Sequence, residues 1–179
     1  MIKQPRLETN RLVLRELASH DLMGVHALHT DPVVQRFLSR QPPKDTAATL
    51  AFIQKIRDGV VAGRWYYWGL FSQAKPNQII GTICLWQFND ERTTAEVGFD
   101  LLPSQHGQGL MTEALRTILQ FAEEQLQLHT ISGLVHAENA PCIRLLIKHK
   151  FQFVRELTVE EKFTAERDLP ILCYERLRE

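Results

Sequence analysis

The sequence predicts a single mixed α/β domain built around a mostly antiparallel sheet, and three observations support this prediction. Three consecutive apolar and β-branched segments, residues 64–71, 78–88 and 93–101, are separated by short polar turns, a pattern typical of an antiparallel meander. After Gly107 the spacing of apolar residues alternates between helical and strand patterns. The 179 residues, 44% hydrophobic and 23% charged, suffice for one core, and no linker or internal repeat divides them, so residues 1–179 are expected to form one domain.

The N-terminal part is expected to contain one strand followed by helices. Apolar and charged side chains alternate over residues 9–17, as in a half-buried strand. A helix that begins at Ser19 should end near Asp31, because the residue before a proline avoids helical backbone angles. The next expected elements are a short helical piece at residues 33–38 and a helix that starts at Asp45 or Thr46 and frays between Gly59 and Gly63.

The C-terminal half brings the predicted total to about seven strands and about four helices. A helix is expected after Gly107, followed by a strand at residues 130–136 and a helix at residues 140–148. The last two expected strands are residues 151–159 and 171–177, joined across a polar connection at residues 162–168.

Charge and cysteine usage narrow the class of protein. Lys plus Arg and Asp plus Glu both number 21, so no net field favours a nucleic acid or an anionic membrane as partner. The charged N-terminus does not resemble a signal peptide, and no segment approaches the roughly 20 apolar residues of a spanning helix, so a cytoplasmic location is expected. Three widely spaced cysteines, with no helical pair of histidines, predict neither a disulfide framework nor a metal site.

Two glycines between a strand and a helix form the most informative motif. Gly107 and Gly109 follow the strand that ends before Pro103, and Met111 and Leu115 begin a helical repeat of apolar residues. Glycine lets a backbone turn closely around an anion, and the unpaired amides at a helix start point toward that anion. The motif therefore predicts a phosphate-binding turn.

Two common phosphate-binding motifs do not match this turn. A P-loop requires a lysine after its last glycine, and no lysine follows Gly109. A dinucleotide-binding motif requires a third glycine where this chain has Thr112, and it follows parallel strands rather than the antiparallel ones expected here.

Four segments of the chain resemble the GNAT superfamily of acyl-CoA-dependent N-acyltransferases and, within it, the Rim-type ribosomal-protein acetyltransferases. They follow one another in the order that the family has. The turn His106-Gly107-Gln108-Gly109-Leu110-Met111 is similar to motif A, Gln/Arg-x-x-Gly-x-Gly/Ala. The other segments are residues 9–15, residues 95–99, and residues 139–151, which resemble an Asn-x-x-Ser/Cys helix and a Lys-x-Gly-Phe ending with Lys150 in place of the glycine. The resemblance implies a GNAT-like sheet, splayed at the motif A strand, and acetyl-CoA as co-substrate without a metal.

The resemblance also implies how the coenzyme is bound. Amides of the turn would bind the pyrophosphate, and N–H groups near the end of the preceding strand would bind the pantetheine arm and the thioester oxygen. Asn139 would contact the coenzyme or cap its helix, and Lys148 would attract the ribose phosphate, although a cation at a helix end needs no ligand to explain it. The expected coenzyme-binding residues are Phe99, Asp100, Leu101, His106, Gly107, Gln108, Gly109, Leu110, Met111, Thr112, Asn139 and Lys148.

Three side chains are candidates for the proton transfers that acetylation of an amine requires. Glu96 would take the ammonium proton, directly or through a water, and its alternative role is that of a solvated or salt-bridged strand residue. Cys142, at a helix start where a thiol pKa can fall, or Tyr174, on the last strand, would protonate the departing thiolate. Core packing is the alternative for both residues. Core packing is also expected for most of the aromatic run at residues 65–68, with an acceptor groove as the alternative.

The expected acceptor is an α-amine. A peptide α-amine has a pKa of about 7.8 and a lysine amine of about 10.4, so one weakly basic glutamate deprotonates the α-amine more readily. The resemblance points to protein N-termini such as those of ribosomal proteins, with acceptor-lining residues expected at 28–44, 65–68 and 160–168. Small amines or polyamines, a non-catalytic acyl-CoA sensor and a nucleotide-binding enzyme stay open as alternatives. Members of the family are often homodimers, and composition does not decide the oligomeric state.

Overall fold

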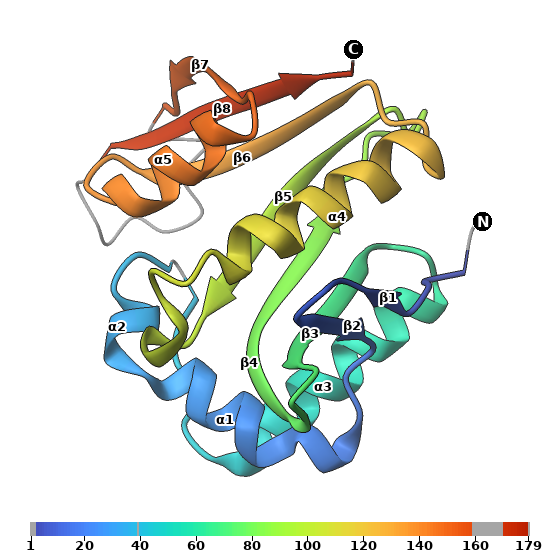
Figure 1. The fold of residues 1–179 in the computed structure, drawn as a ribbon, viewed down its shortest axis with the longest axis vertical. Coiled ribbons are helices and arrows are strands. Elements are labelled where there is room, and N and C mark those ends of the chain that lie inside the picture. Colours follow the sequence, from blue (N-terminus) through green and yellow to red (C-terminus); the bar gives the residue numbers. More distant parts are fainter. Residues whose placement is uncertain (1–2, 39, 159–169, 179) are drawn as a thin grey trace.

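The computed structural model describes residues 3–38, 40–158 and 170–178. Its eight described strands form one open sheet in the order β1-β2-β3-β4-β5-β6-β8-β7 (Figure 1), in which all neighbours are antiparallel except β5 and β6. The strands are β1 Leu7–Glu8, β2 Leu12–Arg15, β3 Tyr66–Ser72, β4 Lys75–Trp86, β5 Thr94–Leu101, β6 Thr130–His136, β7 Gln152–Glu156 and β8 Ile171–Leu177. The helices are α1 Leu22–Thr30, α2 Pro32–Gln35, α3 Thr46–Val61, α4 Leu110–Glu124 and α5 Ala140–Lys148.

This architecture confirms the predicted mixed α/β fold with a mostly antiparallel sheet. The bounds of β6, α5 and β8 are those expected from the apolar spacing. The strand expected at residues 151–159 ends at Glu156, and residue 159 and the connection at 162–168 lie outside the described residues. Among the described helices, none is long and apolar enough to cross a bilayer.

The prediction that a strand begins at residue 9 was wrong, because β2 begins at Leu12. The N–H of Thr9 donates to the Leu12 carbonyl at 2.9 Å, which closes a turn between β1 and β2. Glu113 of α4 holds this turn, because its carboxylate accepts hydrogen bonds from the Thr9 hydroxyl and from the Arg11 N–H. No local pattern could indicate this break, since the two partners lie about 100 residues apart in sequence.

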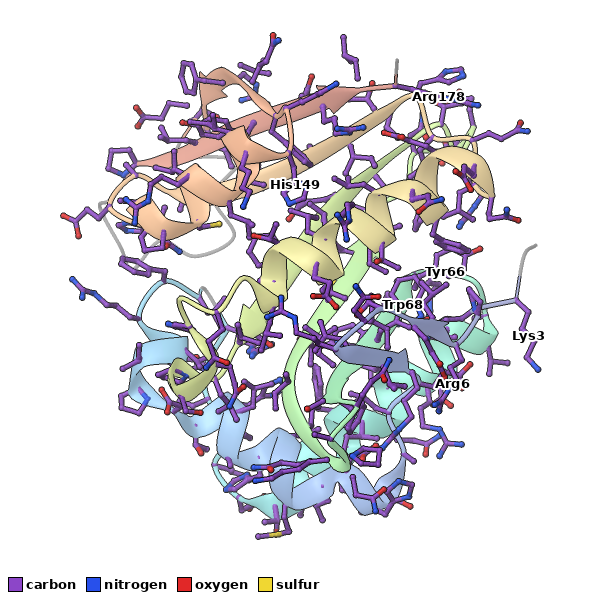
Figure 2. The ribbon with its side chains drawn as sticks, in the orientation of Figure 1. Lys3, Arg6, Tyr66, Trp68, His149 and Arg178 are labelled. Atoms are coloured by element: carbon purple, nitrogen blue, oxygen red, sulfur yellow. The ribbon has the colours of Figure 1, made fainter. Side chains whose placement is uncertain are left out.

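Helices cover both faces of the sheet (Figure 1). Side chains alternate between the two faces along β3. Tyr66 and Trp68 point toward α4, where their ring centroids lie 5.4 Å and 5.6 Å from that of Phe121 (Figure 2). Tyr67 and Phe71 point to the opposite face, which is covered by α1 and α3. The expectation that most of the aromatic run packs in the core is therefore confirmed.

Helix α5 ends at Lys148 although no glycine follows it. Lys150 adopts a φ of 66°, the left-handed conformation that glycine usually provides. Its N–H donates to the Ile147 carbonyl at 2.9 Å, and the N–H of Phe151 donates to the Leu146 carbonyl at 3.1 Å. Burial of Phe151 in the core fixes this ending.

The sheet opens between its two parallel strands. Residues Thr94 to Glu96 of β5 pair with Thr130 to Ser132 of β6, and the pairing stops there, although β5 continues to Leu101 and β6 to His136. β4 stays paired with β5, and β8 stays paired with β6, over the rest of their length. The splay implied by the resemblance is thus present, after Glu96.

Candidate active site

A cavity of about 1340 Å³ passes through the opening between β5 and β6. Ala95 and Val97 belong to the core beneath α4 and α5, as do Ile131 and Val135. Because strand side chains alternate, Glu96, Asp100 and His136 face the opposite side of the sheet. Residues on both faces of the sheet therefore line the cavity, and we call these two groups its α4–α5 mouth and its α1–α2 mouth. The α4–α5 mouth is lined by Gly107, Gly109, Leu110, Met111, Thr112, Asn139, Cys142, Arg144 and Lys148, and the α1–α2 mouth by Val33, Val34, Phe37, Arg40, Tyr67, Glu96, Asp100 and His136.

Two left-handed glycines shape the turn at the α4–α5 mouth. Gly107 and Gly109 have φ angles of 73° and 74°, which residues with side chains disfavour. A Cβ atom at Gly107 would meet no atom within 4 Å, so a ligand can approach the backbone closely. Gly109 precedes α4 and supplies no side-chain cap, which leaves the N–H groups at the start of the helix without intrahelical acceptors. This geometry fits a pyrophosphate.

His106 fastens the turn to the end of β5, and Gln108 fastens it to the segment just after that strand. His106 Nε2 lies 2.9 Å from the carbonyl oxygen of Leu101. Gln108 Nε2 donates to the Ser104 carbonyl at 3.0 Å. His106 lines the cavity, whereas Gln108 is not among the described lining residues. The side chain of Gln108 therefore keeps the turn in shape instead of facing a ligand.

Arg11 holds the same turn from the other end of the chain, a role that sequence reasoning missed. Its Nη1 donates to the Gln108 carbonyl at 2.8 Å, and its Nε donates to Glu113 at 2.8 Å (Oε2). Burial raises the pKa of Glu113, but hydrogen bonds from Thr9 and Arg11 outweigh this and hold it below its usual value. Arg11 thus compensates the negative charge of the Glu113 carboxylate, which would otherwise repel an anion at the start of α4.

Glu96 lies where the two parallel strands separate. It lines the α1–α2 mouth and is the last residue of β5 that pairs with β6. Burial raises the pKa of Glu96 to about 7, against the lowering effect of a hydrogen bond from Trp86. A carboxyl group with this pKa is well matched to accept a proton near neutral pH.

Asp100 is engaged by protein groups. Its Oδ1 accepts hydrogen bonds from the Thr82 N–H at 3.0 Å and the Thr82 hydroxyl at 2.7 Å, and its Oδ2 accepts one from Arg40 Nη2 at 2.7 Å. The Asp100 side chain therefore anchors the segment after α2 to the sheet. Phe99 and Leu101 line the cavity beside it.

Asn139 and Cys142 lie together at the start of α5. Asn139 Oδ1 accepts a hydrogen bond from the Cys142 N–H at 3.3 Å, so Asn139 caps the helix. Both residues line the cavity. A helix start can lower the pKa of a thiol, but burial raises the pKa of Cys142 to about 12. The effect of burial exceeds that of the helix start.

Tyr174 is placed away from the cavity. It is only 7% exposed, belongs to the core cluster beneath α4 and α5, and contacts the Phe153 ring edge-on with centroids 5.8 Å apart. It is not among the described residues that line the cavity. The structure thus does not bring Tyr174 together with Glu96 and Cys142.

Two cations of α5 flank the α4–α5 mouth. Lys148 was expected there, and Arg144, which lies one turn earlier, lines the cavity as well. Helical residues four apart share a face, so this spacing could have identified Arg144 from the sequence. Both side chains are exposed at the rim, where they can meet phosphate groups.

Comparison with known proteins agrees with this geometry. Residues 11–152 match the family model of the acetyltransferase (GNAT) domain. The chain is 29% identical over 146 residues to "Uncharacterized N-acetyltransferase p20" of Bacillus licheniformis, with 82% of each chain covered. The chain therefore belongs to the GNAT family and is an N-acetyltransferase.

Solved structures share the whole fold. An acetyltransferase (GNAT family) from Bacillus anthracis superimposes with a TM-score of 0.80 at 19% identity, covering 97% of this chain and 98% of that one. RimL, a ribosomal L7/L12 α-N-protein acetyltransferase in complex with coenzyme A, superimposes with a TM-score of 0.83 at 16% identity, covering 94% and 95%. Membership of the GNAT family supports acetyl-CoA as the co-substrate.

Proposed function

We propose that this enzyme transfers an acetyl group from acetyl-CoA directly to the α-amine of a polypeptide N-terminus in the cytoplasm. The observation that carries the proposal is Glu96, a partly buried carboxyl group whose pKa burial raises to about 7, at the point where β5 and β6 separate.

The pKa of Glu96 favours an α-amine over a lysine side chain. A peptide α-amine has a pKa of about 7.8, so its ammonium form gives up a proton to Glu96 at a small free-energy cost. A lysine ammonium, with a pKa of about 10.4, would cost roughly 3.5 kcal/mol more. A single base of this strength is therefore suited to the N-terminal amine.

Charges at the α1–α2 mouth disfavour a polyamine. A polycation would need several unpaired carboxylates, but Asp100 is neutralised by Arg40 at 2.7 Å. Glu96 is only partly ionised near pH 7. A ligand with one ammonium group and an otherwise uncharged backbone fits these residues better.

The chain's own residues supply the groups that the transfer needs. Glu96 would accept a proton from the ammonium group, after which the amine nitrogen bonds to the thioester carbon. The carbon–sulfur bond then breaks, and the proton that the new amide nitrogen loses passes to the departing coenzyme A thiolate. The N–H groups of β5 that face the gap after Glu96 have no strand partner in β6 and would stabilise the thioester oxygen. The Gly107–Gly109 turn would hold the pyrophosphate, with Arg144 and Lys148 near the other phosphate.

The fold neighbours give the first acceptor to test. RimL is a ribosomal L7/L12 α-N-protein acetyltransferase, and it shares this fold over almost its full length. A ribosomal-protein N-terminus is accordingly our first candidate for this enzyme. Whether the enzyme works as a homodimer is a separate question that its mass in solution answers.

A thiol-release assay tests the proposal. Purified enzyme and acetyl-CoA are incubated with a peptide that carries a free α-amine, the same peptide with a blocked α-amine and an internal lysine, and spermidine. Release of coenzyme A only with the free α-amine is expected. Equal release with spermidine or with the blocked peptide would contradict the assignment of the acceptor.

A further inference from the structure

His136 carries a buried polar atom without a partner. It ends β6, is only 5% exposed, and lines the α1–α2 mouth of the cavity. Its Nε2 has no hydrogen-bond partner in the part of the chain that the structure describes. Leaving such a group unpaired costs about 1–3 kcal/mol, so a ligand that pairs with it gains affinity.

The hydrogen bonds around His136 determine what that partner must be. The N–H of Glu138 donates to His136 Nδ1 at 3.2 Å, so Nδ1 carries no proton. The neutral imidazole then has its proton on Nε2, and the unpaired atom is a donor that requires an acceptor. A carbonyl oxygen meets this requirement, whereas an ammonium group does not.

The position of His136 is rigid. Its carbonyl accepts a hydrogen bond from the Asn139 N–H at 2.8 Å, and its backbone pairs with Ile171 of β8. The Phe37 ring contacts the imidazole with centroids 5.3 Å apart. The donor therefore keeps one direction and can select a ligand by geometry.

The distance from Glu96 indicates how long the ligand must be. Ser132 pairs with Glu96, and His136 lies four residues further along the same face of β6. With a rise of about 3.3 Å per residue, the two side chains are separated by roughly 13 Å along the strand. An extended peptide whose α-amine reaches Glu96 has its fourth or fifth residue at the level of His136.

We propose that His136 binds the acceptor by donating from Nε2–H to the backbone carbonyl of its fourth or fifth residue. This inference rests on the proposed function and deepens it, because it makes the acceptor an extended polypeptide and not a free amino acid or small amine. A pantetheine amide has the same carbonyl chemistry, but it would enter through the α4–α5 mouth, on the other face of the sheet.

Kinetics with two peptide lengths and three variants test the proposal. The substrates are a dipeptide amide and a hexapeptide amide that share their first two residues. The variants are His136→Phe, which removes the donor but keeps a planar ring, His136→Gln, which restores an N–H, and His129→Phe as a matched control. His129 is exposed and precedes β6, away from the lining of the cavity.

The expected result is a five- to tenfold higher KM of His136→Phe for the hexapeptide, an effect typical of one neutral hydrogen bond. Its KM for the dipeptide, its KM for acetyl-CoA and its kcat should stay within about twofold, and His136→Gln should recover most of the loss. Because a purely structural role would move all of these constants together, the split between them is the informative readout.

Three outcomes would overturn the inference. The first is an equal effect on both peptides, and the second is a rise in the KM for acetyl-CoA, which would assign the carbonyl to pantetheine. The third is a His136→Phe variant whose KM for the hexapeptide equals that of the wild type. If the wild-type enzyme acetylates neither peptide, both the proposed function and this inference are wrong. If the enzyme acetylates both peptides and His136→Phe does not change the KM for either, only this inference is wrong.

Discussion

The two mouths of the cavity bind their ligands by different means. The α4–α5 mouth presents backbone amides from one continuous segment, the turn of Gly107 and Gly109 and the start of α4. The α1–α2 mouth presents side chains that come from α2 and the turn after it, and from β3, β5 and β6, such as Phe37, Tyr67 and Glu96. Backbone sites depend on local conformation, whereas side-chain sites depend on which distant segments meet. Substitutions should therefore affect the first mouth through its supports and the second through the substituted side chain itself.

The largest expected effect is on the chemistry at Glu96. Glu96→Gln should lower kcat/KM for the peptide at pH 7.5 by about 10²–10⁴, the usual contribution of a general base. The wild-type rate should rise with pH through about 7, as Glu96 loses its proton, and this limb should be missing in the variant. Glu156→Gln, at an exposed position on β7, is the matched control. Wild-type rates in the variant would exclude Glu96 as the base.

The stability of the same variant should show that the raised pKa arises from burial. Below about pH 4.5 the Glu96 carboxyl is protonated in folded and unfolded chains, and between about 4.5 and 7 only the folded chain keeps the proton, so stability falls over this window. Above pH 7 the ionised, buried carboxylate costs up to about 3 kcal/mol. Glu96→Gln should therefore unfold at a higher denaturant concentration than wild type at pH 8 and at an equal one at pH 4.5. An equal difference at both pH values would contradict this account.

An intermediate effect is expected at the support of the glycine turn. Arg11→Gln removes the hydrogen bond to the Gln108 carbonyl and the charge that offsets Glu113. The KM for acetyl-CoA should rise about tenfold, which corresponds to about 1.4 kcal/mol, while kcat and the KM for the peptide change little. Arg6→Gln, at an exposed ion pair with Glu8 just before β1 (Figure 2), serves as the control. A loss of kcat and peptide binding together would show that Arg11 orders more than the turn.

The smallest effect is expected at Cys142. Transfer of a proton from a thiol with a pKa of about 12 to a coenzyme thiolate, with a pKa of about 8.5, is uphill by roughly 5 kcal/mol. We therefore expect Cys142→Ala to change kcat by less than about threefold at pH 7 and pH 9. Steady-state kinetics check this expectation. A fall of kcat by a hundredfold would restore Cys142 as the acid.

The sequence was most informative where one short segment sets both conformation and chemistry. The bounds of β6, α5 and β8 follow from the periodicity of their apolar residues. The turn at Gly107 and Gly109 follows from glycine's freedom in the left-handed region. It was least informative for residues 28–44, where Phe37 and Arg40 line the cavity as expected but their partners on β5 and β6 were not foreseen. The acceptor residues expected at 160–168 lie outside the described residues.

By itself, the sequence determined the mixed α/β order of elements, the glycine turn and the presence of a glutamate on the strand before it, because these features depend on neighbouring residues. Only the tertiary structure decided their electrostatic state. Burial raised the pKa of both Glu96 and Cys142, Arg40 neutralised Asp100, and Arg11 reached across the fold to the glycine turn. Burial and charge pairing depend on residues that are distant in the chain, and only the folded sheet brings them together.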